Sequence, residues 1–243
     1  MKKMKNMLIN HVRLIAGALT VLVLFSACKK QDLNNASLPP LAGLMAFNLS
    51  PDQPAVGFDV ASNRLANNAY GYTNYTGVYL PVYTGTSEVR AFDFNTGSTL
   101  AFSNLNFSDS SYYSTFLLGA NGNYRNITVM DNLNLLAATN GKAWVRYVNA
   151  IPDSTTNPVI MVSSNGDNNI TDTAHYGSVS DFVQVSAGQV NASIGNGTTI
   201  SASRAMTLEE NKIYTFLFVG IPAAADTGRA VQIRFIQNGS ITR

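Results

Sequence analysis

The chain has 243 residues, of which 46% are hydrophobic and 12% are charged, and its formal net charge is +2. The first 27 positions hold four of the sixteen basic residues and none of the fourteen acidic ones, so the remainder has a formal charge of −2. Apart from Lys29-Lys30 this remainder has no basic cluster, so we do not expect nucleic acid as a partner. Cys28 is the single cysteine, which excludes a disulfide within the chain.

Residues 1–27 have the three parts of a secretory signal peptide. A head with lysines and an arginine precedes an apolar run at 14–25, and the small residues Ser26 and Ala27 follow. The apolar run has twelve residues, whereas a transmembrane helix needs about 20. The pattern therefore predicts a segment that is removed from the mature protein.

The sequence Phe25-Ser26-Ala27-Cys28 resembles a bacterial lipobox, in which the cysteine becomes the first mature residue and carries lipid. It departs from the usual pattern in having Phe25 where Leu is common. We expect Cys28 to anchor the protein to a membrane and residues 28–43, with two prolines and no hydrophobic period, to form a tether. The predicted location is the outer membrane, with the cell surface and the periplasmic face both left open.

The rest of the chain contains a tandem repeat. "YSTFLLG" at 113–119 matches "YTFLFVG" at 214–220, and Asn48 matches Asn149 at the same offset. Further matches occur in the same order in both halves: Tyr70 with Tyr176, Tyr79 with Phe182, and "ITVMDN" at 127–132 with "IRFIQN" at 233–238. Short matches kept in order indicate a duplicated unit. The predicted domains are residues 44–137 and 142–243.

The pattern of each copy predicts short strands that are rich in β-branched and aromatic residues and are separated by Gly, Asn, Asp and Pro. In the last of them Val231, Ile233 and Phe235 alternate with polar residues. Trp144, the single tryptophan, is expected to lie in the core of the second copy. The sequence predicts an all-β protein with two tandem immunoglobulin-like antiparallel β-sandwich domains. In the second copy the expected strands are 143–150, 158–162, 182–188, 189–195, 213–220 and 230–237.

The segments "VRYVNAIPD", "YGSVSDFVQVSAG" and "LEENKIYTFLFVG" of the second copy resemble the bacterial repeat called domain of unknown function 4397. The resemblance covers nearly all of the second copy and, more loosely, the first. It implies an extracytoplasmic β domain, often present in tandem and often in lipid-anchored proteins. It implies no activity, because the family has none firmly assigned.

No catalytic constellation is predicted. After the signal peptide the chain has one histidine, His175, and no nucleophile-elbow pattern. The adjacent Glu209 and Glu210 are expected to point apart, so they cannot flank a glycosidic bond. One histidine and the lone Cys28 are too few ligands for a zinc site. We therefore expect neither an enzyme nor a cofactor.

Acidic residues in loops are interpreted as turn residues. The loop "NGDNNITD" at 165–172 offers oxygen ligands but lacks the spacing and the terminal Glu of a calcium loop. Asp52 and Asp153 follow proline in both copies and are expected to accept hydrogen bonds from backbone amides. No metal site is predicted.

Tyrosines are concentrated at 70–85, where five of the eleven lie. Tyr72, Tyr75 and Tyr83 have no counterpart in the second copy by sequence matching, so a common core does not explain them. Tyrosine combines an apolar face with a polar tip, which suits contact with a sugar or a protein. We predict these three residues as ligand contacts, with ordinary strand packing as the alternative.

These observations together predict a lipid-anchored, non-enzymatic binding or display module of the cell envelope, with a glycan or an envelope protein as ligand. Two alternatives stay open: a structural spacer without a ligand, and a glycan-acting hydrolase. An exposed aromatic ledge would favour binding, and two facing carboxylates in a cleft would favour the hydrolase.

Overall fold

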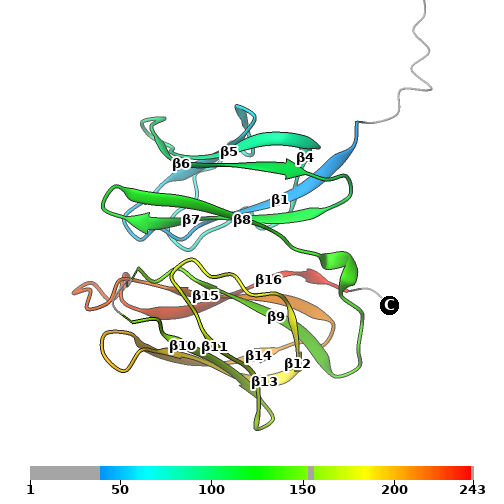
Figure 1. Ribbon diagram of the computed structural model, residues 1–243, viewed down its shortest axis with the longest axis vertical. Coiled ribbons are helices and arrows are strands. Elements are labelled where there is room, and N and C mark those ends of the chain that lie inside the picture. Colours follow the sequence, from blue (N-terminus) through cyan, green and yellow to red (C-terminus); the bar gives the residue numbers. More distant parts are fainter. Residues whose placement is uncertain (1–38, 153–155, 242–243) are drawn as a thin grey trace, which may run out of the picture. The chain divides into compact units, whose positions relative to one another are not determined.

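A computed structural model describes residues 39–152 and 156–241. The predicted signal peptide, Cys28, most of the predicted tether and Asp153 lie outside the described residues. Figure 1 shows an all-β architecture in which each repeat is built from two four-stranded sheets. Repeat 1 consists of β1 (Leu41–Asn48), β2 (Val56–Val60), β3 (Asn63–Arg64), β4 (Leu80–Tyr83), β5 (Gly85–Asp93), β6 (Thr99–Phe107), β7 (Tyr112–Ala120) and β8 (Asn123–Met130).

A linker containing the 3₁₀ turn η2 (Leu133–Leu135) leads to the second repeat. Repeat 2 consists of β9 (Lys142–Asn149), β10 (Val159–Ser164), β11 (Asp167–Thr173), β12 (Val183–Ser186), β13 (Gly188–Gly195), β14 (Ser201–Leu208), β15 (Lys212–Val219) and β16 (Gln232–Ser240). The predicted strands of this copy are all present. Strands β11 and β14 were missed because most of their side chains are exposed and polar.

The two repeats have the same topology. We call β4-β1-β7-β8 and β12-β9-β15-β16 the inner sheets, and β3-β2-β5-β6 and β11-β10-β13-β14 the outer sheets. Among the described strands none pairs across the repeats. Pairing is antiparallel except that β1 runs parallel to β7, and β9 to β15. The predicted all-β tandem sandwich is confirmed, and its antiparallel pairing has one exception in each repeat, at a pair whose two strands are joined through the outer sheet rather than by a hairpin.

Each repeat has an apolar core between its outer and inner sheets. In repeat 2 this core includes Val145, Phe216 and Ile233, with Val231 and Phe235 packed against it. The predicted alternation of the last strand is thus confirmed. The predicted domain boundary at residue 44 falls inside β1, which begins at Leu41.

A further apolar cluster joins the inner sheets of the two repeats, which lie next to each other in Figure 1. We call it the junction cluster. Its buried members come from β1, β7 and the residues after them in repeat 1, and from the equivalent segments in repeat 2. They are Met45, Phe47, Leu49, Phe116 and Leu118, with Val148, Ala150, Leu217 and Val219.

Trp144 is not in the core of repeat 2, so that prediction was wrong. Side chains alternate along β9, and Ala143, Val145 and Tyr147 face the core of the repeat. Trp144 and Arg146 therefore point to the opposite face, toward repeat 1. Sequence reasoning missed that this face is also covered.

A buried asparagine fixes the end of the first strand in each repeat. Asn149 Nδ2 donates to the carbonyls of Ala174 and His175, and its Oδ1 accepts from the Ile151 amide at 3.1 Å. Asn48 makes the same kind of contacts, including a donated bond to the Tyr70 carbonyl at 2.9 Å. The repeated asparagine is therefore a structural residue that satisfies buried backbone groups.

Candidate functional site

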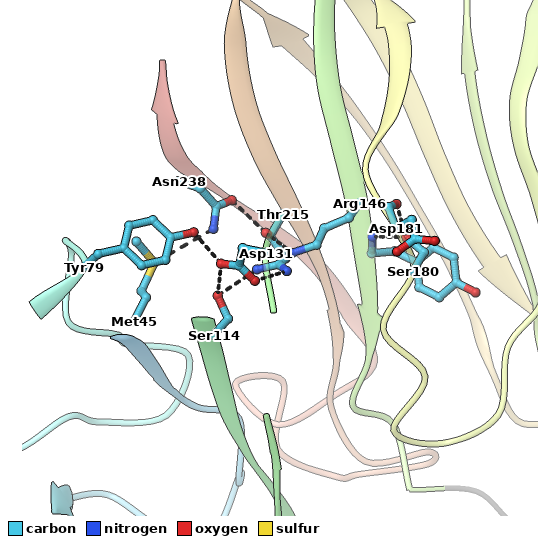
Figure 2. Close-up of polar contacts among 10 residues, drawn as sticks. Met45, Tyr79, Ser114, Asp131, Arg146, Ser180, Asp181, Thr215 and Asn238 are labelled. Carbon is cyan, nitrogen blue, oxygen red and sulfur yellow. Dashed lines mark hydrogen bonds and ion pairs between the residues drawn. The ribbon is translucent and has the colours of Figure 1, made fainter. Parts of the chain in front are cut away.

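A buried ion pair connects the two repeats (Figure 2). Asp131 follows β8 in repeat 1, and Arg146 lies in β9 of repeat 2, with 2% and 1% of their surface exposed. Arg146 Nη1 donates to Asp131 Oδ1 at 2.5 Å. The other carboxylate oxygen accepts from Ser114 Oγ at 2.7 Å and from the Tyr79 hydroxyl. Both oxygens of the carboxylate are therefore engaged.

The Arg146 guanidinium is held on several sides. Its Nε donates to Thr215 Oγ1 at 2.9 Å, and its Nη2 donates to Ser114 Oγ at 2.8 Å. The Phe182 ring lies against it, with its centroid 4.6 Å from Cζ. Removing one partner of such a buried pair leaves an uncompensated charge, which costs several kcal/mol.

Tyr79 completes the network in a neutral form. Burial raises the pKa of its hydroxyl well above the usual value near 10, and the Asp131 carboxylate raises it further. The hydroxyl stays protonated at neutral pH and donates to Asp131. It supplies no base to a reaction under these conditions.

A pocket of about 400 Å³ opens beside this ion pair, and we call it the junction pocket. Trp144 and Phe182 provide aromatic surface, and Ser180, Asp181 and Asn132 provide polar groups. The volume lies within the range of pockets that bind small molecules. Met130, Leu135 and Leu136, together with Val129 and Val179, add apolar surface.

Hydrogen bonds hold two side chains of the junction pocket, Trp144 and Ser180. Trp144 Nε1 donates to the Ala137 carbonyl in the linker at 3.0 Å. Ser180 Oγ accepts from the Tyr147 amide at 2.9 Å and donates to the Asp181 carbonyl at 3.0 Å. Such fixed side chains lower the entropic cost of ordering a binding site.

The three tyrosines predicted as ligand contacts do not form one surface. Tyr75 is half-buried and stacks on Phe47, with ring centroids 5.1 Å apart and planes within 7°. Tyr72 also packs against the junction cluster, and burial raises its pKa to about 12. Tyr83 is 65% exposed and lines a separate cavity of about 170 Å³ with Arg64 and Pro81. Their ligand role stays a prediction.

Hydrogen bonding corrects the repeat matching in this segment. The Thr73 and Gly177 amides donate to the carbonyls of Asn48 and Asn149, which makes these two positions equivalent. Tyr176, which directly precedes Gly177, is therefore the counterpart of Tyr72 and not of Tyr70. Both tyrosines pack against the junction cluster, so Tyr72 is not extra to repeat 1.

The other candidate groups lie apart from the pocket. His175 is exposed in its loop. Asp52 accepts from the Asn121 amide at 2.6 Å, as expected for a turn residue, and also from the Tyr124 hydroxyl. Within the described ranges there is no group of three or more His, Cys, Asp or Glu that could hold a metal ion.

Sequence reasoning missed Asp131 and Arg146. A signal was present in "AWVRYVN", where the alternation places Arg146 on the face opposite Val145 and Tyr147, in the middle of an apolar strand. A charge at such a position requires a buried partner. The partner comes from the other repeat, which the local sequence does not reveal.

Comparison with known protein families agrees with the tandem repeat. The profile described as "Domain of unknown function (DUF4397)" matches residues 42–156 and 143–234. The chain belongs to this family, as a tandem of two of its domains. None of the curated proteins matches the sequence significantly. In the part of the chain that the structure describes, no helix is both long and apolar enough to span a membrane.

Several solved structures are similar to the chain at a low level. A family 41 carbohydrate-binding module from streptococcal virulence factors that recognises α-glucan is 10% identical, with a TM-score of 0.23 over 79% of this chain and 96% of that one. A family 26 module from Eubacterium rectale, solved with maltoheptaose, is 8% identical, with a TM-score of 0.24 over 83% and 98%. A candidate cell adhesion protein from Bacteroides eggerthii is 10% identical, with a TM-score of 0.23 over 84% and 98%. At these scores the likeness assigns no function.

Proposed function

We propose that the protein is a lipid-anchored, non-enzymatic module of the cell envelope that binds a glycan in the junction pocket. The observation that carries the proposal is the pairing of Trp144 and Phe182 with polar groups around a volume of about 400 Å³. Aromatic rings contact the apolar faces of sugar rings, while a carboxylate, an amide and a hydroxyl can bond sugar hydroxyls. Asp181, Asn132 and Ser180 supply those groups.

The carboxylates of the pocket support binding over catalysis. A glycoside hydrolase uses two carboxyl groups that flank the bond to be cleaved. The pocket contains Asp131 and Asp181, but both oxygens of Asp131 are engaged by Arg146, Ser114 and Tyr79. Asp131 is therefore a structural residue, and one exposed carboxylate is left to contact a ligand.

The single tryptophan of the chain provides a direct assay, because Trp144 lines the pocket. Titrating the purified protein with oligosaccharides and cell-wall glycan fragments should give a saturable change in Trp144 fluorescence. Phe182→Ala should weaken this binding about tenfold or more, as truncation of a central aromatic contact does at a binding hot spot. The matched control is Phe102→Ala, which changes a phenylalanine that is 60% exposed and does not line the pocket, and which should leave the affinity unchanged.

Two outcomes would contradict the proposal. If no glycan in a broad screen changes the tryptophan emission, the spacer interpretation is favoured. If a glycan binds with the same affinity to the parent protein and to the Phe182→Ala variant, the ligand site lies elsewhere.

Membrane attachment through Cys28 is a separate part of the proposal. Cys28→Ala should release the protein from the membrane fraction or block its processing, because no lipid can be attached at that position. A variant that remains in the membrane fraction at the mature size would contradict lipid anchoring. Protease treatment of intact cells distinguishes the cell surface from the periplasmic face.

A further inference from the structure

The interface between the repeats is built from equivalent positions of the two copies. Strands β1 and β9 match at an offset of 101 residues, which places Met45 where repeat 2 has Arg146. Strands β7 and β15 match at the same offset, which places Ser114 where repeat 2 has Thr215. Both inner sheets therefore contribute the same face to the junction cluster.

The ends of β8 and β16 are equivalent as well. Tyr113 pairs with Met130, and its counterpart Tyr214 pairs with Gln237. The next residues, Asp131 and Asn238, therefore occupy equivalent positions.

The contacts across the interface are reciprocal (Figure 2). Arg146 of repeat 2 donates to Asp131 of repeat 1. In the equivalent contact, Asn238 Nδ2 of repeat 2 donates to Met45 Sδ of repeat 1 at 3.8 Å. Each polar partner is also supported within its own repeat.

These supporting bonds have the same length. Ser114 Oγ donates to Asp131 at 2.7 Å, and Thr215 Oγ1 donates to Asn238 Oδ1 at 2.7 Å. Reciprocal contacts between equivalent residues are the property of an interface with two-fold symmetry, in which one surface pairs with a copy of itself.

A self-complementary face of this kind could also pair like with like between two chains. Pairing of repeat 1 with repeat 1 of a second chain would bury the carboxylate of Asp131 against Met45, which carries no positive charge. Pairing of repeat 2 with repeat 2 of a second chain would bury Arg146 against Asn238, which carries no negative charge. Only the pairing of repeat 1 with repeat 2 places Arg146 beside Asp131 and neutralises both charges. The other two pairings are disfavoured because an unpaired buried charge is strongly unfavourable.

We propose that the Arg146–Asp131 pair selects the partner of each inner face. It favours pairing of repeat 1 with repeat 2 and disfavours pairing of either repeat with its own kind in a second chain. The junction cluster, which is apolar on both sides, supplies attraction without this discrimination.

The test uses the full chain with residues exchanged between equivalent positions. Arg146→Met alone and Asp131→Asn alone each leave one buried charge and should raise the unfolding equilibrium constant about a hundredfold or more. The double variant, Arg146→Met with Asp131→Asn, gives both sides the same Met and Asn residues and should recover most of this loss. A double variant no more stable than the single variants would contradict the proposed pairing.

Partner choice is measured by refolding from urea over a wide range of protein concentration, followed by light scattering. The parent should refold as a monomer. The double variant should form a growing fraction of dimers or larger species, because like pairing between chains is no longer opposed. A double variant that refolds as monomer at every concentration would overturn the proposal.

A fourth variant moves the ion pair to the other side of the interface. It combines the double variant with Met45→Arg and Asn238→Asp, and Met45→Arg in the parent chain is its matched control. The transferred pair should restore monomeric refolding and raise stability above that of the double variant. If the four-residue variant is as unstable as the control, the two sides are not equivalent and the inference fails.

Discussion

Replacing Tyr75 by alanine distinguishes a packing role from a ligand role for the tyrosine-rich segment. The Tyr75 ring stacks on Phe47, which is fully buried in the junction cluster. Truncating a fully buried aromatic costs about 3–5 kcal/mol. Since Tyr75 is half-buried, about half of that applies, or roughly 2 kcal/mol, and the stacked pair adds about 0.5–1 kcal/mol.

The expected loss for Tyr75→Ala is therefore about 2–3 kcal/mol in the free energy of unfolding. Tyr83 is 65% exposed, and Tyr83→Ala should stay within about 0.5 kcal/mol of the parent. Both are measured by urea unfolding followed by circular dichroism, with a check that the slope m is unchanged. A Tyr75→Ala variant as stable as Tyr83→Ala would refute the assignment of Tyr75 to the junction cluster.

Three further predictions concern stability. Asn149→Ala should cost about 2–4 kcal/mol in urea unfolding, because it leaves one buried amide and two carbonyls without their partner. The raised pKa of Tyr79 means that its contribution to stability is complete below about pH 10 and is lost progressively as the pH rises further, so Tyr79→Phe should flatten the alkaline loss of stability measured by urea unfolding. Gly119→Ala and Gly220→Ala should each cost about 2 kcal/mol or more in thermal unfolding, because both glycines have positive φ and a Cβ would lie within 2.3 Å of a backbone oxygen.

The sequence was sufficient to predict the all-β class, because period-two alternation and turn residues are local signals. It was also sufficient to predict the duplication, because short matches recur in the same order in both halves. The face of each strand that meets the other repeat was harder to predict. Trp144 illustrates the difficulty: a large aromatic in a strand is expected in the nearest core, but alternation places it on the second covered face of the inner sheet. Both faces of β9 are covered, so hydrophobicity alone could not decide between them.

Register was the second source of error. Matching by similarity aligned Ile127 with Ile233, whereas strand pairing aligns Ile127 with Arg234. A shift of one residue moves a side chain to the opposite face of a sheet. Ile127 accordingly packs against the junction cluster, while Ile233 lies in the core of repeat 2. Chemical similarity favoured the wrong register because the isoleucine and valine residues of β8 pack against the junction cluster, whereas the similar apolar residues of β16, Ile233 and Phe235, face the core of repeat 2.

The difference between the repeats at one pair of equivalent positions explains why the pocket lies beside repeat 2. The counterpart of Trp144 is Gly43, where a Cβ would lie 2.8 Å from the Tyr112 ring and 3.0 Å from Tyr79 Cβ. In repeat 1 the space over this position is therefore filled by tyrosines, whose rings meet edge to face with centroids 5.0 Å apart. In repeat 2 the tryptophan occupies the position itself and is held by the linker through Ala137. A duplicated face thus became asymmetric by exchange of a few side chains, and the asymmetry placed an aromatic pocket next to the ion pair that joins the repeats.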